Sequence, residues 1–225
     1  MRNRDMAILK NLTKFRCMSR DDIVELHFSH LKNPITSCNT VLKRLRRDGH
    51  VEVNTTFQPY VYFPQPSAIR KTSQKIPHFL GIVDAYKQLI QNEKPKIFKV
   101  EPKYGKEYME PDIFTIWRKA PFFIEVQKSI YSKAVMQEKI KRYEMYFCGM
   151  KWQEESWQPS NKKIFPSILI LTDRKYDVSS ANFRIFQANS IKDFLNQITP
   201  KHPKKKSLFK WDQEKINLKG VIYYE

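Results

Sequence analysis

The chain has 225 residues, of which 41% are hydrophobic and 13% aromatic, a composition sufficient for one large or two small folded cores. No apolar run reaches the roughly 18 residues that a membrane-spanning helix needs, and the charged N-terminal segment is unlike a secretory signal. The three cysteines, Cys17, Cys38 and Cys148, lack the spacing of a zinc site. We therefore expect reduced thiols, no membrane contact and a cytoplasmic location.

The net charge of +18 is the strongest signal in the composition. Solubility alone needs a net charge of only about 2–8 in a small domain. A larger positive charge concentrates polyanions near the protein surface and makes their binding dependent on salt. The charge therefore predicts nucleic acid as the partner, with an anionic membrane or an acidic protein as the alternatives.

The first fifty residues have the periodicity of three helices. Apolar spacing predicts helices over residues 5–15 and 19–28, and Ser19 begins the second with a pattern typical of a capping box. After a loop, Thr36 is expected to cap a third helix, which Gly49 ends in a left-handed conformation.

Two short extended runs follow, over residues 51–55 and 60–63, and a turn at Gln58 and Pro59 joins them. Three helices followed by a hairpin are the order of elements in a winged helix-turn-helix. We assign this fold to residues 1–64 and expect the hairpin to be the wing.

The third helix carries a buried stripe and a polar, basic face. The stripe has helical spacing and consists of Cys38, Val41, Leu42 and Leu45. In a winged helix the third helix enters the major groove of DNA, where Asn and Arg read base edges and the wing touches the backbone. The candidate DNA-binding residues are Ser37, Asn39, Thr40, Lys43, Arg44 and Arg47, with Gln58 in the wing. The alternative is a winged helix that docks onto another protein.

The rest of the chain predicts a second domain after a linker. Residues 65–75 are rich in Pro, Ser and basic side chains without periodicity, as expected for a solvated spacer. Helices are then expected over residues 77–91, 131–147 and 191–198, and strands over 97–100, 113–117, 122–126, 167–172 and 183–187. Mixed helices and strands of this order define an α/β domain, residues 76–200, so the whole chain is expected to be α+β or α/β.

Acidic residues at the 113–126 hairpin suggest a metal-binding catalytic site. Asp112 precedes one strand and Glu125 lies near the end of the next, so the two carboxylates can converge across the hairpin. Two such carboxylates can bind Mg²⁺ or Mn²⁺ and activate water for attack on a phosphodiester, and Asp84 is a candidate third acid. In the alternative, Asp112 caps a turn, Glu125 pairs with Arg142 or Lys141, and the domain is a scaffold.

The pair Pro111-Asp112 and the segment Glu125-Val126-Gln127-Lys128 resemble the PD-(D/E)xK nuclease superfamily. The resemblance implies that Asp112 and Glu125 hold the metal, while Gln127 stands where the superfamily has its lysine and Lys128 follows one residue late. On this basis Asp112, Glu125, Gln127 and Asp84 form the candidate catalytic set.

A longer series of elements and motifs along the chain is similar to that of the replication-relaxation family. It consists of a winged helix, a helix bearing His78, Pro111-Asp112, the strand FFIEVQKS and the segment from Lys139 to Tyr143. That family is encoded on plasmids, integrative elements and phages of Gram-positive bacteria. The resemblance implies a bacterial protein, located in the cytoplasm or nucleoid, that binds DNA in replication, mobilisation or their control.

Residues 201–225 form a basic tail whose end, residues 221–224, is apolar enough for a terminal strand. Lysines in such a run can each contact about one phosphate without reading sequence. The candidate phosphate-contacting residues are Lys204, Lys205 and Lys206 in the tail, with Lys128 and Arg142 in the second domain.

Three functions remain open from the sequence. The first is a sequence-specific binder of double-stranded DNA from a mobile element, expected as a homodimer because winged-helix regulators often read two half-sites. The second is a metal-dependent DNA endonuclease directed by the winged helix. The third is an adaptor that contacts replication or mobilisation proteins.

Overall fold

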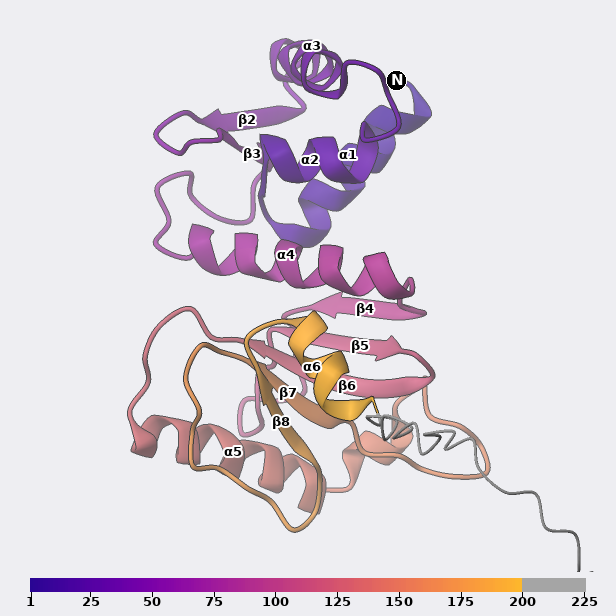
Figure 1. The fold of residues 1–225 in the computed structure, drawn as a ribbon, viewed down its shortest axis with the longest axis vertical. Helices are drawn as coiled ribbons and strands as arrows, with labels where there is room; N and C mark the ends of the chain where they lie inside the picture. The colour runs from indigo at the N-terminus through magenta and orange to yellow at the C-terminus, as the bar shows by residue number, and fades with distance from the viewer. Residues whose placement is uncertain (200–225) are drawn as a thin grey trace, which may run out of the picture.

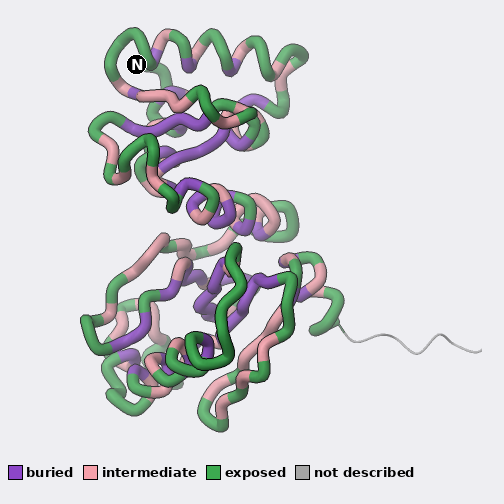
Figure 2. The backbone as a smooth tube through the Cα atoms, turned by 90° about the vertical axis from the view of Figure 1, so that its left-hand side faces the viewer, coloured by how far each residue is buried: buried purple, intermediate pink, exposed green. Residues whose placement is uncertain are grey.

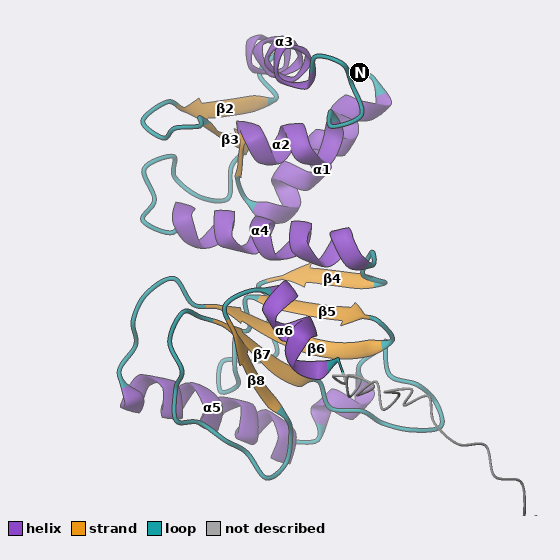
Figure 3. Ribbon diagram, in the orientation of Figure 1, coloured by secondary structure: helices purple, strands orange, loops and turns teal. Residues whose placement is uncertain are grey.

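The computed structural model describes residues 1–199, which form a mixed α/β protein with six α-helices and two sheets (Figures 1 and 3). The N-terminal part contains α1 (Asn3–Phe15), β1 (Met18–Ser19), α2 (Arg20–His27), α3 (Pro34–Arg47), β2 (Val51–Asn54) and β3 (Val61–Pro64). Its sheet has the antiparallel order β1-β3-β2. Strand β1 was not expected, because two residues are too few to show alternation.

Local signals explain where these helices begin. The Ser19 hydroxyl accepts a hydrogen bond from the Asp22 N–H, and the Asp22 carboxylate accepts one from the Ser19 N–H, which confirms the expected capping box. The prediction that Thr36 caps α3 was wrong, since α3 begins at Pro34 after Asn33. Proline is favoured in the first helical position because its missing N–H has no partner there anyway.

The C-terminal part contains α4 (Ile76–Asn92), β4 (Ile97–Val100), β5 (Ile113–Trp117), β6 (Ala120–Val126), α5 (Lys133–Cys148), the 3₁₀ helix η1 (Lys151–Glu154), β7 (Ser167–Leu171), β8 (Ile185–Ala188) and α6 (Ile191–Ile198). The sheet order is β4-β5-β6-β7-β8, in which β4, β5 and β6 run antiparallel and β7 and β8 run parallel to β6. Every strand expected between residues 97 and 187 is present, and β8 begins two residues later than the run 183–187 suggested.

The two faces of the larger sheet pack against different helices. Alternate residues of β6, such as Ile124 and Val126, join α4 and α6 in one hydrophobic core. Phe123 on the opposite face joins α5 in a second core. The side chain of Glu125 shares the α5 face with Phe123, because alternate residues of a strand point the same way.

The first of these cores continues without interruption into the N-terminal part. Helix α4 lies between α1 and α2 on one side and the sheet on the other (Figure 1), and buried segments run through this junction (Figure 2). Phe15 of α1 contacts Tyr86 of α4 and Phe98 of β4, with ring centroids 5.1 and 6.0 Å apart. The two parts therefore pack as one body through α4.

Residues 65–75 are mostly exposed, and a few contacts hold the segment against this body. The Asn54 side-chain amide donates a hydrogen bond to the Lys71 carbonyl at 2.7 Å, and the Lys71 ammonium lies 3.1 Å from the Glu52 carboxylate. Ile69 packs against the first core. The segment thus follows strand β2 before it enters α4.

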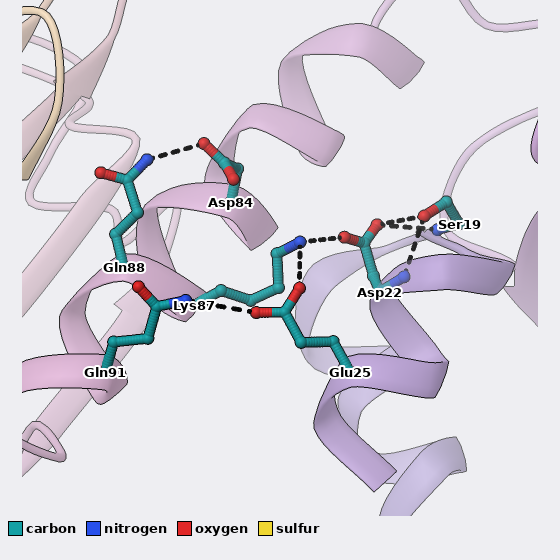
Figure 4. A network of polar contacts seen from close by, with 7 residues as sticks. All are labelled: Ser19, Asp22, Glu25, Asp84, Lys87, Gln88 and Gln91. Carbon is teal, nitrogen blue, oxygen red and sulfur yellow. Dashed lines mark hydrogen bonds and ion pairs between the residues drawn. The ribbon is translucent and has the colours of Figure 1, made fainter. Parts of the chain in front are cut away.

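A polar network also joins the two parts (Figure 4). The Lys87 ammonium on α4 lies 2.8 Å from the Asp22 carboxylate and 2.9 Å from the Glu25 carboxylate, both on α2. Burial acts to lower the pKa of Lys87, but the two carboxylates raise it above its ordinary value. The ammonium is therefore charged and fixes α2 on α4.

None of the helices within residues 1–199 is long and apolar enough to cross a membrane.

Candidate functional site

The outer face of α3 exposes a polar and basic surface. Asn39, Thr40, Lys43 and Arg47 are all exposed, whereas Cys38, Leu42 and Leu45 are buried beneath them. Val41, expected in the stripe, is only half-buried. The division of α3 into an apolar and a basic face follows the sequence prediction closely.

Arg44 does not belong to this outer face. Its guanidinium donates hydrogen bonds to both carboxylate oxygens of Asp5 on α1, at 2.8 and 2.9 Å, and Asp5 is only 1% exposed. Burial acts to raise the pKa of Asp5, but hydrogen bonds from the Arg2 N–H and from Arg44 hold it below its ordinary value. Arg44 therefore orients α3 on α1, and Ser37, seven residues earlier, lies half-buried on the same flank.

Arg46 belongs to the candidate surface and was missing from the residues proposed from sequence. It is exposed and lies on the flank of α3 that faces the β2–β3 hairpin. The signal was present in the run of basic residues at the end of α3, but only the packing of α3 shows which of them face outward. Gln58 is exposed in the hairpin loop, as expected for a wing tip.

Asp112 and Glu125 come together as the sequence suggested. The antiparallel register pairs Ile113 with Ile124, which places Asp112 across from Glu125 at the end of the hairpin. The Val126 N–H donates a hydrogen bond to Asp112 Oδ2 at 2.7 Å. His78 at the start of α4 places its Nε2 atom 3.4 Å from Asp112 Oδ1.

Glu125 is almost fully buried and is bound from α5. The Lys139 ammonium donates to Glu125 Oε2 and the Tyr143 hydroxyl donates to Oε1, both at 2.6 Å. This corrects the expected pairing with Arg142 or Lys141, since the Arg142 guanidinium instead donates to the Lys106 carbonyl at 3.1 Å. Lys139 and His78 were not proposed as site residues, although both lie in the motifs that carry the family resemblance.

The pKa values of both Asp112 and Glu125 are raised above their ordinary values. Burial raises the pKa of Glu125, and the nearby Asp112 carboxylate raises it further, while Lys139 counteracts both. Burial also raises the pKa of Asp112. For His78, burial lowers the pKa, which favours a neutral imidazole at neutral pH. Two carboxyls with raised pKa values beside a lysine and a histidine make this group a candidate functional site.

The remaining predicted residues lie outside this group. Asp84 accepts a hydrogen bond from the Gln88 side chain on the exposed surface of α4, so it does not supply the third acid (Figure 4). The Gln127 amide donates to the Ser129 carbonyl at 2.5 Å. Lys128 is exposed, and its stem passes over Gly81 of α4. The tail residues Lys204, Lys205 and Lys206 and the expected terminal strand lie outside the described residues.

The acidic pair is the candidate position for a magnesium ion, although both Glu125 carboxylate oxygens already accept hydrogen bonds from Lys139 and Tyr143. Within residues 1–199 no group of three or more His, Cys, Asp or Glu side chains is placed to hold a metal ion alone. Magnesium sites that act on nucleic acid need only one or two carboxylates, because substrate phosphates complete the coordination. Asp112 and Glu125 would be those ligands, and Lys139 now supplies the positive charge beside Glu125.

Comparisons of the chain with protein-family models, curated proteins and solved structures find no match. The resemblance to the replication-relaxation family therefore remains a prediction from motifs.

Proposed function

We propose that this protein binds double-stranded DNA through residues 1–64, folded as a winged helix-turn-helix with α3 in the major groove. The observation that carries the proposal is the outer face of α3, where Asn39, Lys43 and Arg47 are exposed beside Arg46. Asn and Arg side chains on an exposed helix have the reach and hydrogen-bonding groups that base edges in the major groove require. The net charge of +18 supplies the non-specific part of the affinity.

The shared core adds a constraint to this proposal. Because α1 and α2 pack on α4, and α4 packs on the sheet, DNA held by α3 would lie at a fixed distance from the second part of the protein. A role in replication, mobilisation or transcriptional control of a mobile element, as the replication-relaxation resemblance implies, is part of the same proposal, as is a homodimer on two half-sites.

Selection of duplexes from a random pool tests the proposal. The expected result is enrichment of a short defined sequence that binds far more tightly than the starting pool. Recovery of the pool without enrichment, at any salt concentration, would contradict sequence-specific binding by α3.

A second candidate function, a DNA endonuclease, is favoured by the convergence of Asp112, Glu125, His78 and Lys139. A divalent ion bound by the two carboxylates would supply Lewis acidity toward a phosphate. In this role Lys139 would stabilise negative charge, and His78, whose Nε2 atom lies 3.4 Å from Asp112 Oδ1, would accept a proton. Nicking of supercoiled plasmid in Mg²⁺ or Mn²⁺ tests this function, and complete absence of nicking in both would exclude it.

A further inference from the structure

A cleft of about 300 Å³ lies between α3 and the β2–β3 hairpin. Its lining comes from the start of α2, the outer flank of α3 and both hairpin strands. The residues that matter for its chemistry are Arg20, Lys43, Arg46, Tyr60 and Tyr62.

The cleft is cationic. Arg20, Lys43 and Arg46 line it, and none of its lining residues is acidic. The Arg20 Nε–H is bonded to the adjacent Asp21 at 2.8 Å, whereas no acidic side chain within residues 1–199 forms an ion pair with Lys43 or Arg46. Unpaired positive charge in a concave surface attracts an anion.

The floor of the cleft is apolar and aromatic. Leu42 and Tyr62 are buried beneath it, Val53 borders it, and Tyr60 stands at the rim with 41% of its surface exposed. A bare inorganic anion would leave this floor uncovered. The combination instead suits a phosphate ester that carries a sugar or ring, because a flat apolar body can rest on the tyrosines while the phosphate meets the arginines.

We propose that this cleft holds one nucleotide unit of the DNA strand that borders the major groove occupied by α3, with its phosphate at Arg46 and Arg20 and its sugar against Tyr60. The inference rests on the proposed DNA binding. A helix seated in the major groove has a phosphate backbone on either side, and the cleft lies on the flank of α3 that meets the backbone nearer the hairpin. The contact fixes the register of α3 without reading a base.

The salt dependence of duplex affinity tests the assignment. For the Arg46→Ala variant, the slope of log affinity against log salt should fall by about 0.9, the value for one lost phosphate contact, on every duplex alike. Arg46→Lys should keep the wild-type slope. Tyr60→Ala should weaken binding and leave the slope unchanged, because it removes no charge.

Two outcomes would overturn the inference. If Arg46→Ala keeps the wild-type slope while Arg47→Ala, which lies outside the cleft, weakens binding, the cleft is not a phosphate site, although α3 still binds DNA. If thymidine monophosphate binds wild-type protein at micromolar concentration and fails to bind Arg46→Ala, the cleft takes a free nucleotide rather than a strand. Absence of duplex binding by the wild-type protein would instead refute the proposed function itself.

Discussion

Arg44 on α3 donates two hydrogen bonds to the buried carboxylate of Asp5 on α1, across 39 positions of sequence. The residue that sequence alone would place on a base edge is therefore a structural tether that sets the angle of α3. If a substitution of Arg44 weakens DNA binding, the expected cause is a displacement of α3 rather than the loss of a base contact.

Replacing Arg44 with Ala should lower the free energy of unfolding by about 2 kcal/mol, because it leaves the Asp5 carboxylate buried without its charged partner. Urea denaturation measures this difference. Arg47→Ala is the matched control, since Arg47 is 75% exposed and within residues 1–199 pairs only with its neighbour Asp48. This variant should change stability by less than about 0.5 kcal/mol. Equal stability of the two variants would contradict the tether.

Lys87 should hold α2 on α4. Lys87→Met removes the charge that the buried Asp22 carboxylate faces, and we expect a loss of about 1–2 kcal/mol in urea denaturation together with faster hydrogen exchange in α2. Gln91→Ala removes only an exposed 3.4 Å hydrogen bond to Glu25 and should leave both measurements nearly unchanged. Unaltered exchange in Lys87→Met would show that α2 does not depend on this network.

His27 should make the protein less stable in mild acid. Burial lowers the pKa of His27 to about 4, and nearby Arg4 adds to this, while the unfolded imidazole titrates near 6.5. Protonation thus favours the unfolded chain, and stability is lost as the pH falls from about 6.5 to about 4. The Asn11 side chain lies 3.1 Å from His27 Nε2, a contact that a glutamine can also make.

Thermal unfolding of His27→Gln across this pH range measures the effect. The variant should lose less stability than the wild-type protein between pH 6.5 and pH 4, whereas His30→Gln, at an exposed position, should follow the wild-type curve. Identical curves for His27→Gln and the wild-type protein would contradict the assignment of this loss to His27.

If the protein nicks plasmid, the activity should depend on the acidic pair. Asp112→Asn and Glu125→Gln keep the side-chain volumes and should each reduce nicking at least about 100-fold, and Lys139→Met should do the same through lost charge stabilisation. Asp84→Asn is the control and should retain full activity, because within residues 1–199 the exposed Asp84 carboxylate forms a hydrogen bond only with Gln88. Nicking that survives Asp112→Asn and Glu125→Gln would come from another site or a contaminant.

Apart from the two-residue strand β1 and the short helix η1, the order of helices and strands could be predicted from the sequence because apolar periodicity marks the elements. The orientation of α3 could not be predicted in this way, because it depends on Asp5. Asp5 is distant from α3 in sequence, and no sequence pattern indicates that its side chain is buried. The same limit applies on α5, where Lys139, Lys141 and Arg142 lie within one turn and the packing of α5 on β6 selects Lys139 as the partner of Glu125. The prediction that Asp84 is a third acid of the site was wrong because α4 buries its apolar residues and leaves Asp84 on its exposed surface.

The most direct test of the central claim compares two double variants that each remove two positive charges. Lys43→Ala with Arg47→Ala alters the outer face of α3, whereas Lys162→Ala with Lys192→Ala alters exposed lysines on the C-terminal part. Fluorescence anisotropy on a selected duplex at fixed salt should show at least about a tenfold loss of affinity for the first pair, beyond any loss for the second. Equal losses for the two pairs would mean that net charge, and not α3, binds the DNA.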